Sequence, residues 1–290
     1  MRRGTDGRYP AIESHAIIGD LQTAALVALD GTIDFLCLPH FDSPSVFASL
    51  LDAEKGGCFR ISPALEQPRH KQLYLPDTNL LLTRFLAPEG VVEISDFMPI
   101  HPPEHTSRLV RRVKTVRGEI RYQIRCAPRF DYARSAHRLK LELGKAVFTD
   151  GNMVLRLASS VPLRADGADA TADFTLRAGE TATFILEQVG EEHDHHPTDL
   201  DGYVKGSFKR TMNFWREWIG LSTYAGRWRD EVHRSALALK LLNARWSGSI
   251  VAAATFGLPE TIGGGRNWDY RYSWIRDASF TLYALSRLGM

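Results

Sequence analysis

The segment GGGRNWDYRYSWIRDASF, residues 263–280, combines two tryptophans, two tyrosines, three arginines and two aspartates. Its aromatic residues Trp268, Tyr270, Tyr272 and Trp274 are each two positions apart, so in an extended segment their rings would share one face. The charged residues between them would lie on the opposite face. The pattern therefore predicts a wall of aromatic rings beside guanidinium and carboxylate groups.

A surface of this kind suits a sugar. Aromatic rings cover the apolar C–H face of a pyranose, while guanidinium and carboxylate groups bind its equatorial hydroxyls. Asp277 also has a structural interpretation, because it precedes the helical pattern of Phe280, Tyr283 and Leu288 and would act as the N-cap of that helix. The residues alone leave both interpretations open.

The first two-thirds of the chain has the pattern of short strands joined by turns. Apolar runs flank the turn residues Asp30-Gly31, Pro88–Gly90, Gly118 and Ala178-Gly179, and each pair of runs predicts a β-hairpin. Beyond Gly118, apolar residues alternate with charged ones, as in a half-buried strand. Many short strands with glycine and proline turns predict an antiparallel β-sandwich.

The pattern becomes helical beyond residue 195. Apolar residues recur three or four positions apart, first around Trp215 and again around Leu239, and a third helical segment begins near Asp277. We therefore expect a multi-domain protein, β then α. Its parts are an N-terminal antiparallel β-sandwich domain over residues 1–197, a linker helix over 198–225, and the start of an α-helical domain over 226–290.

The composition is that of an ordinary globular protein. A formal net charge of +2 argues against nucleic acid or an anionic membrane as a partner, since such binders concentrate excess Lys and Arg. No apolar run is long enough to cross a bilayer, and the N-terminus lacks the apolar core of a secretory signal. The widely spaced Cys37, Cys58 and Cys126 predict free thiols in a reducing, cytoplasmic compartment.

We expect neither a metal nor a cofactor. The run His193-Asp194-His195-His196 contains residue types that ligate metals, but adjacent histidines in a polar segment are usually solvated, and no further ligand is defined. Gly263–Gly265 is not followed by Lys-Ser/Thr, so it is not a phosphate-binding loop.

Two longer segments resemble a known family. GGGRNWDYRYSWIRDAS, residues 263–279, resembles the motif that opens the catalytic domain of glycoside hydrolase family 15, which comprises glucoamylases, glucodextranases and prokaryotic trehalases. GTIDFLCLPHFDSPSVFASLLD, residues 31–52, is similar to the N-terminal signature of the family's prokaryotic members. Weaker similarities follow in the family's order, in YLPDTNLLLTRF, APRFDYARS and AAATFGLPETIGG.

The resemblance implies a β-supersandwich followed by an (α/α)6 barrel of six helical hairpins, of which this chain holds only the first helices. It also implies an inverting hydrolase that acts on α-glucosidic bonds at the non-reducing end of its substrate, such as an α-glucan, an isomalto-dextrin or trehalose. Arg276 and Asp277 match the pair that binds the hydroxyls of the terminal glucose. Tyr270 and Trp274 match aromatic residues of the same subsite.

The catalytic residues are expected beyond residue 290. Inversion needs a general acid and a general base, and the resemblance implies two glutamates in later helical hairpins. We therefore expect no hydrolysis by this chain alone, with the missing C-terminal catalytic region as its partner. A non-catalytic carbohydrate-binding or interaction module is the alternative, and a purely structural remnant is the third. An incomplete barrel would leave Leu282, Leu285 and Leu288 without partners.

Four further residues are candidates for lining the pocket, namely Trp268, Glu260, His40 and Asp42. For Glu260, in the loop before the motif, the alternative is a structural hydrogen bond. His40 and Asp42 belong to the N-terminal signature, where a scaffold role is equally consistent. Asp131 and Tyr132 have the same two interpretations.

Overall fold

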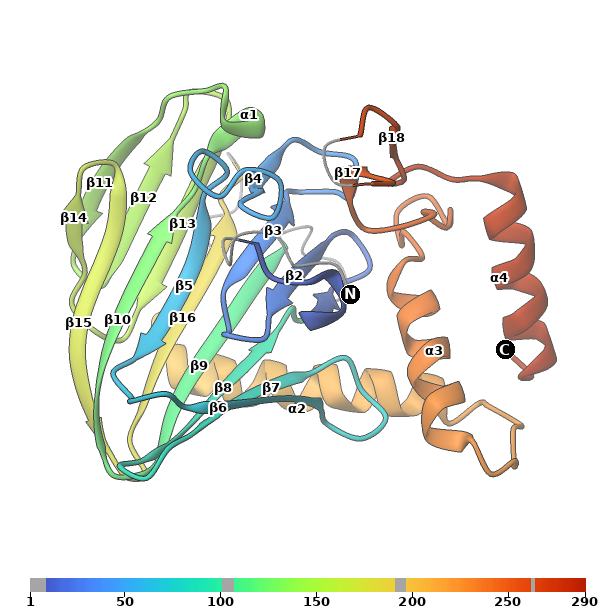
Figure 1. The fold of residues 1–290 in the computed structure, drawn as a ribbon, viewed down its shortest axis with the longest axis horizontal. Helices are drawn as coiled ribbons and strands as arrows, with labels where there is room; N and C mark the ends of the chain where they lie inside the picture. The colour runs from blue at the N-terminus through green and yellow to red at the C-terminus, as the bar shows by residue number, and fades with distance from the viewer. Residues whose placement is uncertain (1–8, 101–106, 191–196, 262–263) are drawn as a thin grey trace.

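The computed structural model describes residues 9–100, 107–190, 197–261 and 264–290. Two eight-stranded antiparallel sheets pack face to face, and the helices α2, α3 and α4 follow them in the chain (Figure 1). An antiparallel β-sandwich followed by helices was the prediction, and this part of it is confirmed. The six-hairpin barrel and the domain boundaries stay predictions.

The first sheet contains the N-terminal strands of the chain. In spatial order its strands are β1 (His15–Gly19), β2 (Ala24–Ala28), β3 (Ile33–Cys37), β5 (Cys58–Pro63), β10 (Glu119–Ala127), β15 (Asp169–Arg177) and β14 (Arg164–Asp166), with β4 (Ser45–Phe47) paired to β3. The short helices η1 (Ile12–Ser14) and α1 (Phe130–Ala133) precede β1 and follow β10.

The second sheet lies against the first and also contacts α2. Its strands in spatial order are β11 (Arg138–Glu142), β12 (Lys145–Thr149), β13 (Val154–Ser159), β16 (Thr181–Gln188), β9 (Arg108–Arg117), β8 (Val91–Phe97), β7 (Leu81–Leu86) and β6 (Arg69–Tyr74). A separate two-stranded sheet pairs β17 (Phe256–Pro259) with β18 (Asn267–Asp269).

Two of the four predicted hairpins are confirmed, and two are wrong. The turns at Asp30-Gly31 and Pro88–Gly90 join the paired strands β2–β3 and β7–β8. Gly118 and Ala178-Gly179 instead join strands of different sheets, β9 to β10 and β15 to β16. Both kinds of connection need turn residues between apolar runs, so the local sequence does not distinguish a hairpin from a crossover between sheets.

The sandwich core follows from the period-two pattern. Along β10 the buried side chains alternate with exposed ones, so that Ile120, Tyr122 and Ile124 point into the core. In β16 both faces are buried. Phe184 faces the first sheet, whereas Ile185 belongs to the apolar cluster that includes residues of α2.

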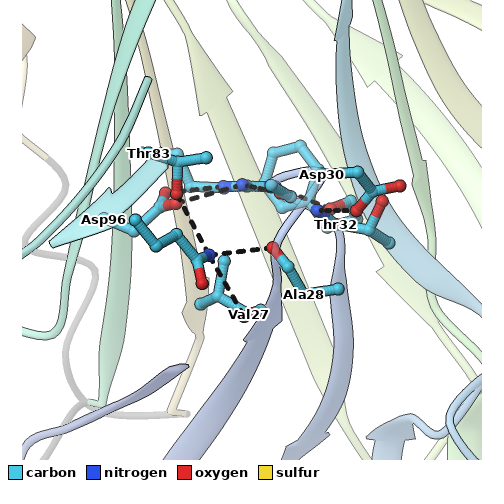
Figure 2. A network of polar contacts seen from close by, with 10 residues as sticks. Val27, Ala28, Asp30, Thr32, Thr83 and Asp96 are labelled. Carbon is cyan, nitrogen blue, oxygen red and sulfur yellow. Dashed lines mark hydrogen bonds and ion pairs between the residues drawn. The ribbon is translucent and has the colours of Figure 1, made fainter. Parts of the chain in front are cut away.

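A charged residue lies at the centre of this core. Arg111 is fully buried, and its Nε donates to Asp96 Oδ1 at 2.8 Å. Its Nη1 donates to the carbonyl of Phe59 at 2.6 Å, and its Nη2 donates to the carbonyl of Gly31. Figure 2 shows this network around Asp96, together with the neighbouring contacts of Thr83 and Ala28. The ion pair of the second sheet is therefore bonded directly to the backbone of the first.

Helix α2 (Leu200–Ile219) covers the outer face of the second sheet (Figure 1). Asp199 caps its N-terminus by accepting a hydrogen bond from the backbone N–H of Gly202 at 2.9 Å. Trp215 is fully buried in the cluster with Val110 and Ile185. The predicted linker helix is therefore tightly packed on the sandwich.

Helix α3 (Arg229–Leu241) and helix α4 (Ile275–Arg287) follow at the C-terminal side. The expectation that three leucines of the last helix lack partners is wrong for two of them. Leu285 and Leu288 pack against the cluster that contains Trp215, whereas Leu282 is 58% exposed. Neither α3 nor any other helix among the described residues is long and apolar enough to span a bilayer.

The three cysteines are free thiols, as expected, with Cys37 and Cys126 buried and Cys58 partly buried. Burial raises the pKa of Cys37 to about 12, because the thiolate would be desolvated. The run His193 to His196, for which no metal is expected, lies outside the described residues.

Candidate functional site

The segment that carries the sugar-binding candidates connects β18 to α4. It runs antiparallel to residues 250–253, with the backbone N–H of Ala253 bonded to the carbonyl of Tyr270 at 2.8 Å and that of Ala252 bonded to the carbonyl of Tyr272 at 3.0 Å. In Figure 1 this segment spans the space between the β17–β18 hairpin and α4. The backbone of the site is thus held by hydrogen bonds on one side.

The four residues predicted to bind substrate lie together. Tyr270 and Trp274 stack with ring centroids 5.4 Å apart and an angle of 23° between the rings. The guanidinium of Arg276 lies 5.7 Å from the ring centroid of Trp274. Arg276 also donates two hydrogen bonds to the carboxylate of Asp277, at 3.1 and 3.2 Å. Ring faces and paired charges therefore occur side by side, as a sugar site requires.

The N-cap interpretation of Asp277 is wrong. Helix α4 begins at Ile275, its N-cap residue is Trp274, and no side chain caps it. Asp277 lies in the first turn, where its negative charge interacts favourably with the helix dipole while its carboxylate accepts from Arg276. The ion pair is on the surface, and hydrogen bonding to Asp277 raises the pKa of Arg276. The side chains of Arg276 and Asp277 are 66% and 33% exposed.

The predicted row of four rings on one face is also wrong. Only residues up to Asp269 are in strand β18, and the chain bends at Arg271 and Tyr272. The two-residue alternation therefore does not continue through the segment. Trp268 and Tyr272 are about half exposed, at 49% and 52%, and the stack is formed by Tyr270 and Trp274.

The pocket-lining candidates have structural contacts of their own. Glu260 pairs with Arg266 at 3.4 Å across the β17–β18 turn, and its backbone N–H bonds to the carbonyl of the same arginine. The ring of His40 lies 5.4 Å from that of Trp246, and its backbone N–H donates to Ser43 Oγ. Asp42 is exposed. Their role in a pocket stays a prediction.

Arg271 is the residue that sequence reasoning missed. The alternation placed it opposite the rings as one of several charged residues, but its side chain is 3% exposed. It forms an ion pair with Asp269 at 2.7 Å and also donates to the sandwich. Burial by itself would raise the pKa of Asp269, but the hydrogen bonds from Arg271 outweigh it and lower that pKa. No local signal distinguishes Arg271 from the exposed Arg266 and Arg276.

Two family models together match most of the chain. The family described as trehalase-like, N-terminal, matches residues 4–205, and glycosyl hydrolases family 15 matches residues 226–290. These two matches place the chain among families of carbohydrate-active hydrolases. The chain belongs to the trehalase-like N-terminal family, and its last 65 residues match glycosyl hydrolases family 15.

Two relatives illustrate the match. The trehalase of Thermoplasma volcanium is 36% identical over 97% of this chain and 45% of its own length. The trehalase of Mycobacterium tuberculosis is 31% identical over 97% of this chain and also 45% of its own length. The chain therefore spans about half the length of the curated relatives it matches.

Solved structures show the same fold at low sequence identity. A bacterial glucoamylase complexed with acarbose superimposes with a TM-score of 0.65 and 10% identity, over 99% of this chain and 51% of that chain. A putative kojibiose phosphorylase gives a TM-score of 0.51 and 9% identity, over 81% of this chain and 40% of that chain.

Proposed function

We propose that this chain is the N-terminal portion of an inverting glycoside hydrolase that acts on α-glucosidic bonds at the non-reducing end. The observation that carries the proposal is the surface formed by Tyr270, Trp274, Arg276 and Asp277 at the start of α4. The stacked rings offer an apolar face to a glucose ring, and the exposed ion pair of Arg276 and Asp277 offers charged hydrogen-bonding groups to its hydroxyls.

Trehalose is the substrate that the comparisons favour. The curated relatives named above are both trehalases and match nearly the whole of this chain. The glucoamylase shares the fold alone, so it supports an α-glucan or an isomalto-dextrin only as the second choice. A terminal α-glucose is common to all of these substrates, and it is the part that the predicted subsite would bind.

The catalytic glutamates are proposed to lie in the region that the relatives have beyond this match. An inverting hydrolase needs two carboxyl groups roughly 6.5–9.5 Å apart, one protonating the leaving oxygen and the other activating water. We therefore expect the 290-residue chain to bind sugar without hydrolysing it.

The proposed division remains a sandwich domain over 1–197, a linker helix over 198–225 and a helical domain from 226. The free cysteines support a cytoplasmic location.

Calorimetry with trehalose and maltose tests the binding. We expect weak binding by the wild-type chain and at least a tenfold loss of affinity in Arg276→Ala, because the donor fork is removed. Arg266→Ala is the matched control, since it removes another exposed arginine that pairs with an acidic residue of the same hairpin. Equal affinities in wild type and Arg276→Ala would contradict the assigned role of the arginine.

A glucose-release assay on the same preparations tests the absence of catalysis. Hydrolysis of trehalose or maltose by the wild-type chain alone would show that the acid and base lie within it. Binding without turnover also suits the alternative function, a non-catalytic carbohydrate-binding module. Activity gained when the chain is joined to the C-terminal region of a trehalase relative distinguishes the two, because a binding module would gain none.

A further inference from the structure

Arg271 connects the sugar-binding segment to the β-sandwich, and the proposed function does not use it. We propose that Arg271 is a positioning residue that fixes segment 270–277 on the sandwich, so that the sandwich takes part in sugar recognition. This inference rests on the proposed function. Its basis is the set of bonds that Arg271 forms with two distant parts of the chain.

The guanidinium of Arg271 uses donors on all three of its nitrogens. Nε and Nη2 donate to the two carboxylate oxygens of Asp269, at 2.9 and 2.7 Å. Nη1 donates to the carbonyl oxygens of Ser43 and Phe41, at 2.6 and 3.2 Å, in the loop between β3 and β4. Nη2 also donates to the hydroxyl of Tyr132 at 3.1 Å. These hydrogen bonds require the planar guanidinium of arginine. The single ammonium group of lysine cannot form the same set.

The sandwich holds Tyr132 in this place at the expense of backbone strain. Asp131, Tyr132 and Ala133 have φ values of 50°, 58° and 62°, in the left-handed region that is unfavourable for residues with a Cβ. Strain of this kind persists where surrounding contacts determine the conformation, and it is concentrated at functional sites. Here the strained turn presents the Tyr132 hydroxyl to Arg271.

Ring contacts complete the connection. The ring of Tyr132 lies edge-on to Phe256, with centroids 5.0 Å apart, and the guanidinium of Arg271 lies over the same phenylalanine at 4.4 Å. Phe256 in β17 is opposite Asp269 in β18. The sandwich turn, the β17–β18 hairpin and Arg271 therefore form one packed group, which we call the Arg271 clamp.

The Arg271 clamp is adjacent to the sugar-binding residues. Arg271 follows Tyr270, whose carbonyl is bonded to Ala253 and whose ring stacks on Trp274. A shift of Arg271 therefore moves the stacked pair, and with it the start of α4. In enzymes, misplacement of reacting groups by about 1 Å can lower the rate about a hundredfold. The Arg271 clamp thus sets the geometry of the subsite without contacting the sugar.

Hydrogen exchange tests the clamp in the 290-residue chain. In Arg271→Met we expect amides of residues 267–277 to exchange at least tenfold faster, while β9 and β16 exchange as in wild type. Arg271→Lys should resemble Arg271→Met, because it retains the charge but not the fork. Tyr132→Phe removes one bond and should cause a smaller increase, which keeps the test informative if Arg271→Met does not fold.

Arg108 provides matched controls in the sandwich. Its side chain is 8% exposed and, like Arg271, it binds a carboxylate, that of Glu187 at 2.6 Å, and a tyrosine hydroxyl, that of Tyr203 at 3.1 Å. Arg108→Met and Tyr203→Phe should destabilise the chain without changing exchange in 267–277. Unchanged exchange in Arg271→Met, or equal loosening in Arg108→Met, would overturn the proposal.

Trehalose affinity, measured where every variant is folded, separates positioning from a merely structural role. Arg271→Met should bind at least tenfold more weakly, whereas Arg108→Met should bind as wild type does. If Arg271→Met exchanges faster in residues 267–277 but binds trehalose with wild-type affinity, the positioning role is overturned. If the wild-type chain binds no sugar, the proposed function fails, and the exchange measurements still decide whether Arg271 holds the segment.

Discussion

Arg111 illustrates at the residue scale how a charge is accommodated in an apolar core. Its ion pair with Asp96 has no solvent-exposed surface on either side chain. Removal of water from two charges is costly, and it is offset here because the guanidinium also donates to backbone carbonyls of the opposite sheet. The packing of the two sheets is therefore fixed by a polar contact as well as by apolar side chains.

Arg111→Met should lower the free energy of unfolding by about 3–5 kcal/mol, because it leaves the Asp96 carboxylate buried without its partner. The double variant Arg111→Met/Asp96→Leu should lose less, since no charge is left unpaired. Urea unfolding followed by tryptophan fluorescence measures both values. A single variant as stable as wild type would show that the pair contributes nothing to the core.

Gly118 shows at the element scale why a chain crosses between sheets at a glycine. Its φ is +89°, and a Cβ at this position would collide with the carbonyl oxygen of Glu89. Gly179, at the other crossover, has a similar φ of +91°, but a Cβ there would meet no atom within 4 Å. Both glycines have a positive φ, but only Gly179 has space for a Cβ.

Gly118→Ala should therefore cost about 2 kcal/mol or more, and Gly179→Ala roughly 1 kcal/mol, because only the first adds a steric clash to the strain of a positive φ. Denaturant midpoints of the two variants give the comparison. Equal losses would mean that the backbone of β9–β10 relaxes enough to accommodate the methyl group.

The Asp269–Arg271 pair predicts a pH dependence for the β17–β18 hairpin. Arg271 lowers the pKa of Asp269 in the folded chain, so the carboxylate contributes its full stability above the ordinary aspartate pKa. This contribution is lost as the pH falls through the lowered folded-state value. Asp269→Asn should be roughly 1–2 kcal/mol less stable than wild type at pH 6, and the difference should shrink near pH 3.

Thermal unfolding of the two proteins at both pH values measures that difference. Asp173→Asn is a suitable control, because the pKa of Asp173 is also lowered, by hydrogen bonds from Gln123 and Arg121, at an exposed site remote from the hairpin. A gap between wild type and Asp269→Asn that stays constant with pH would contradict an ionised Asp269 in the Arg271 clamp.

At the scale of the whole molecule, four apolar side chains of α4 are largely exposed to solvent. Ile275, Phe280, Leu282 and Tyr283 are 89%, 69%, 58% and 67% exposed. Clustered exposed apolar residues favour association. We expect the 290-residue chain to self-associate at micromolar concentrations, and Phe280→Ser/Tyr283→Ser to weaken association at least tenfold.

Sedimentation velocity over a concentration series checks this expectation. Leu143→Ser serves as the control, because Leu143 is fully exposed in the turn between β11 and β12, far from α4 in the fold. A wild-type chain that stays monomeric, or an equal effect of Leu143→Ser, would show that α4 does not mediate association.

Local patterns in the sequence predicted the β-sandwich and the helices, and the resemblance of one motif to a known family singled out the residues of the proposed sugar-binding surface. Strand alternation, helical periodicity and the motif around Trp274 and Asp277 depend on neighbours within a few positions, so they can be read along the chain. The start of α4 was misplaced by two residues, because Arg276 rather than the backbone binds the Asp277 carboxylate.

Only the tertiary structure decided which turns join the two sheets and which arginine is buried. Gly118 and Gly179 have the same local signals as the hairpin turns, and their partners lie in distant strands. Arg271 is one of three arginines in its segment, and it is set apart by Tyr132 and by the loop at Ser43, each more than a hundred positions away. Such contacts depend on chain topology, which determines the surroundings of each side chain and leaves no local pattern.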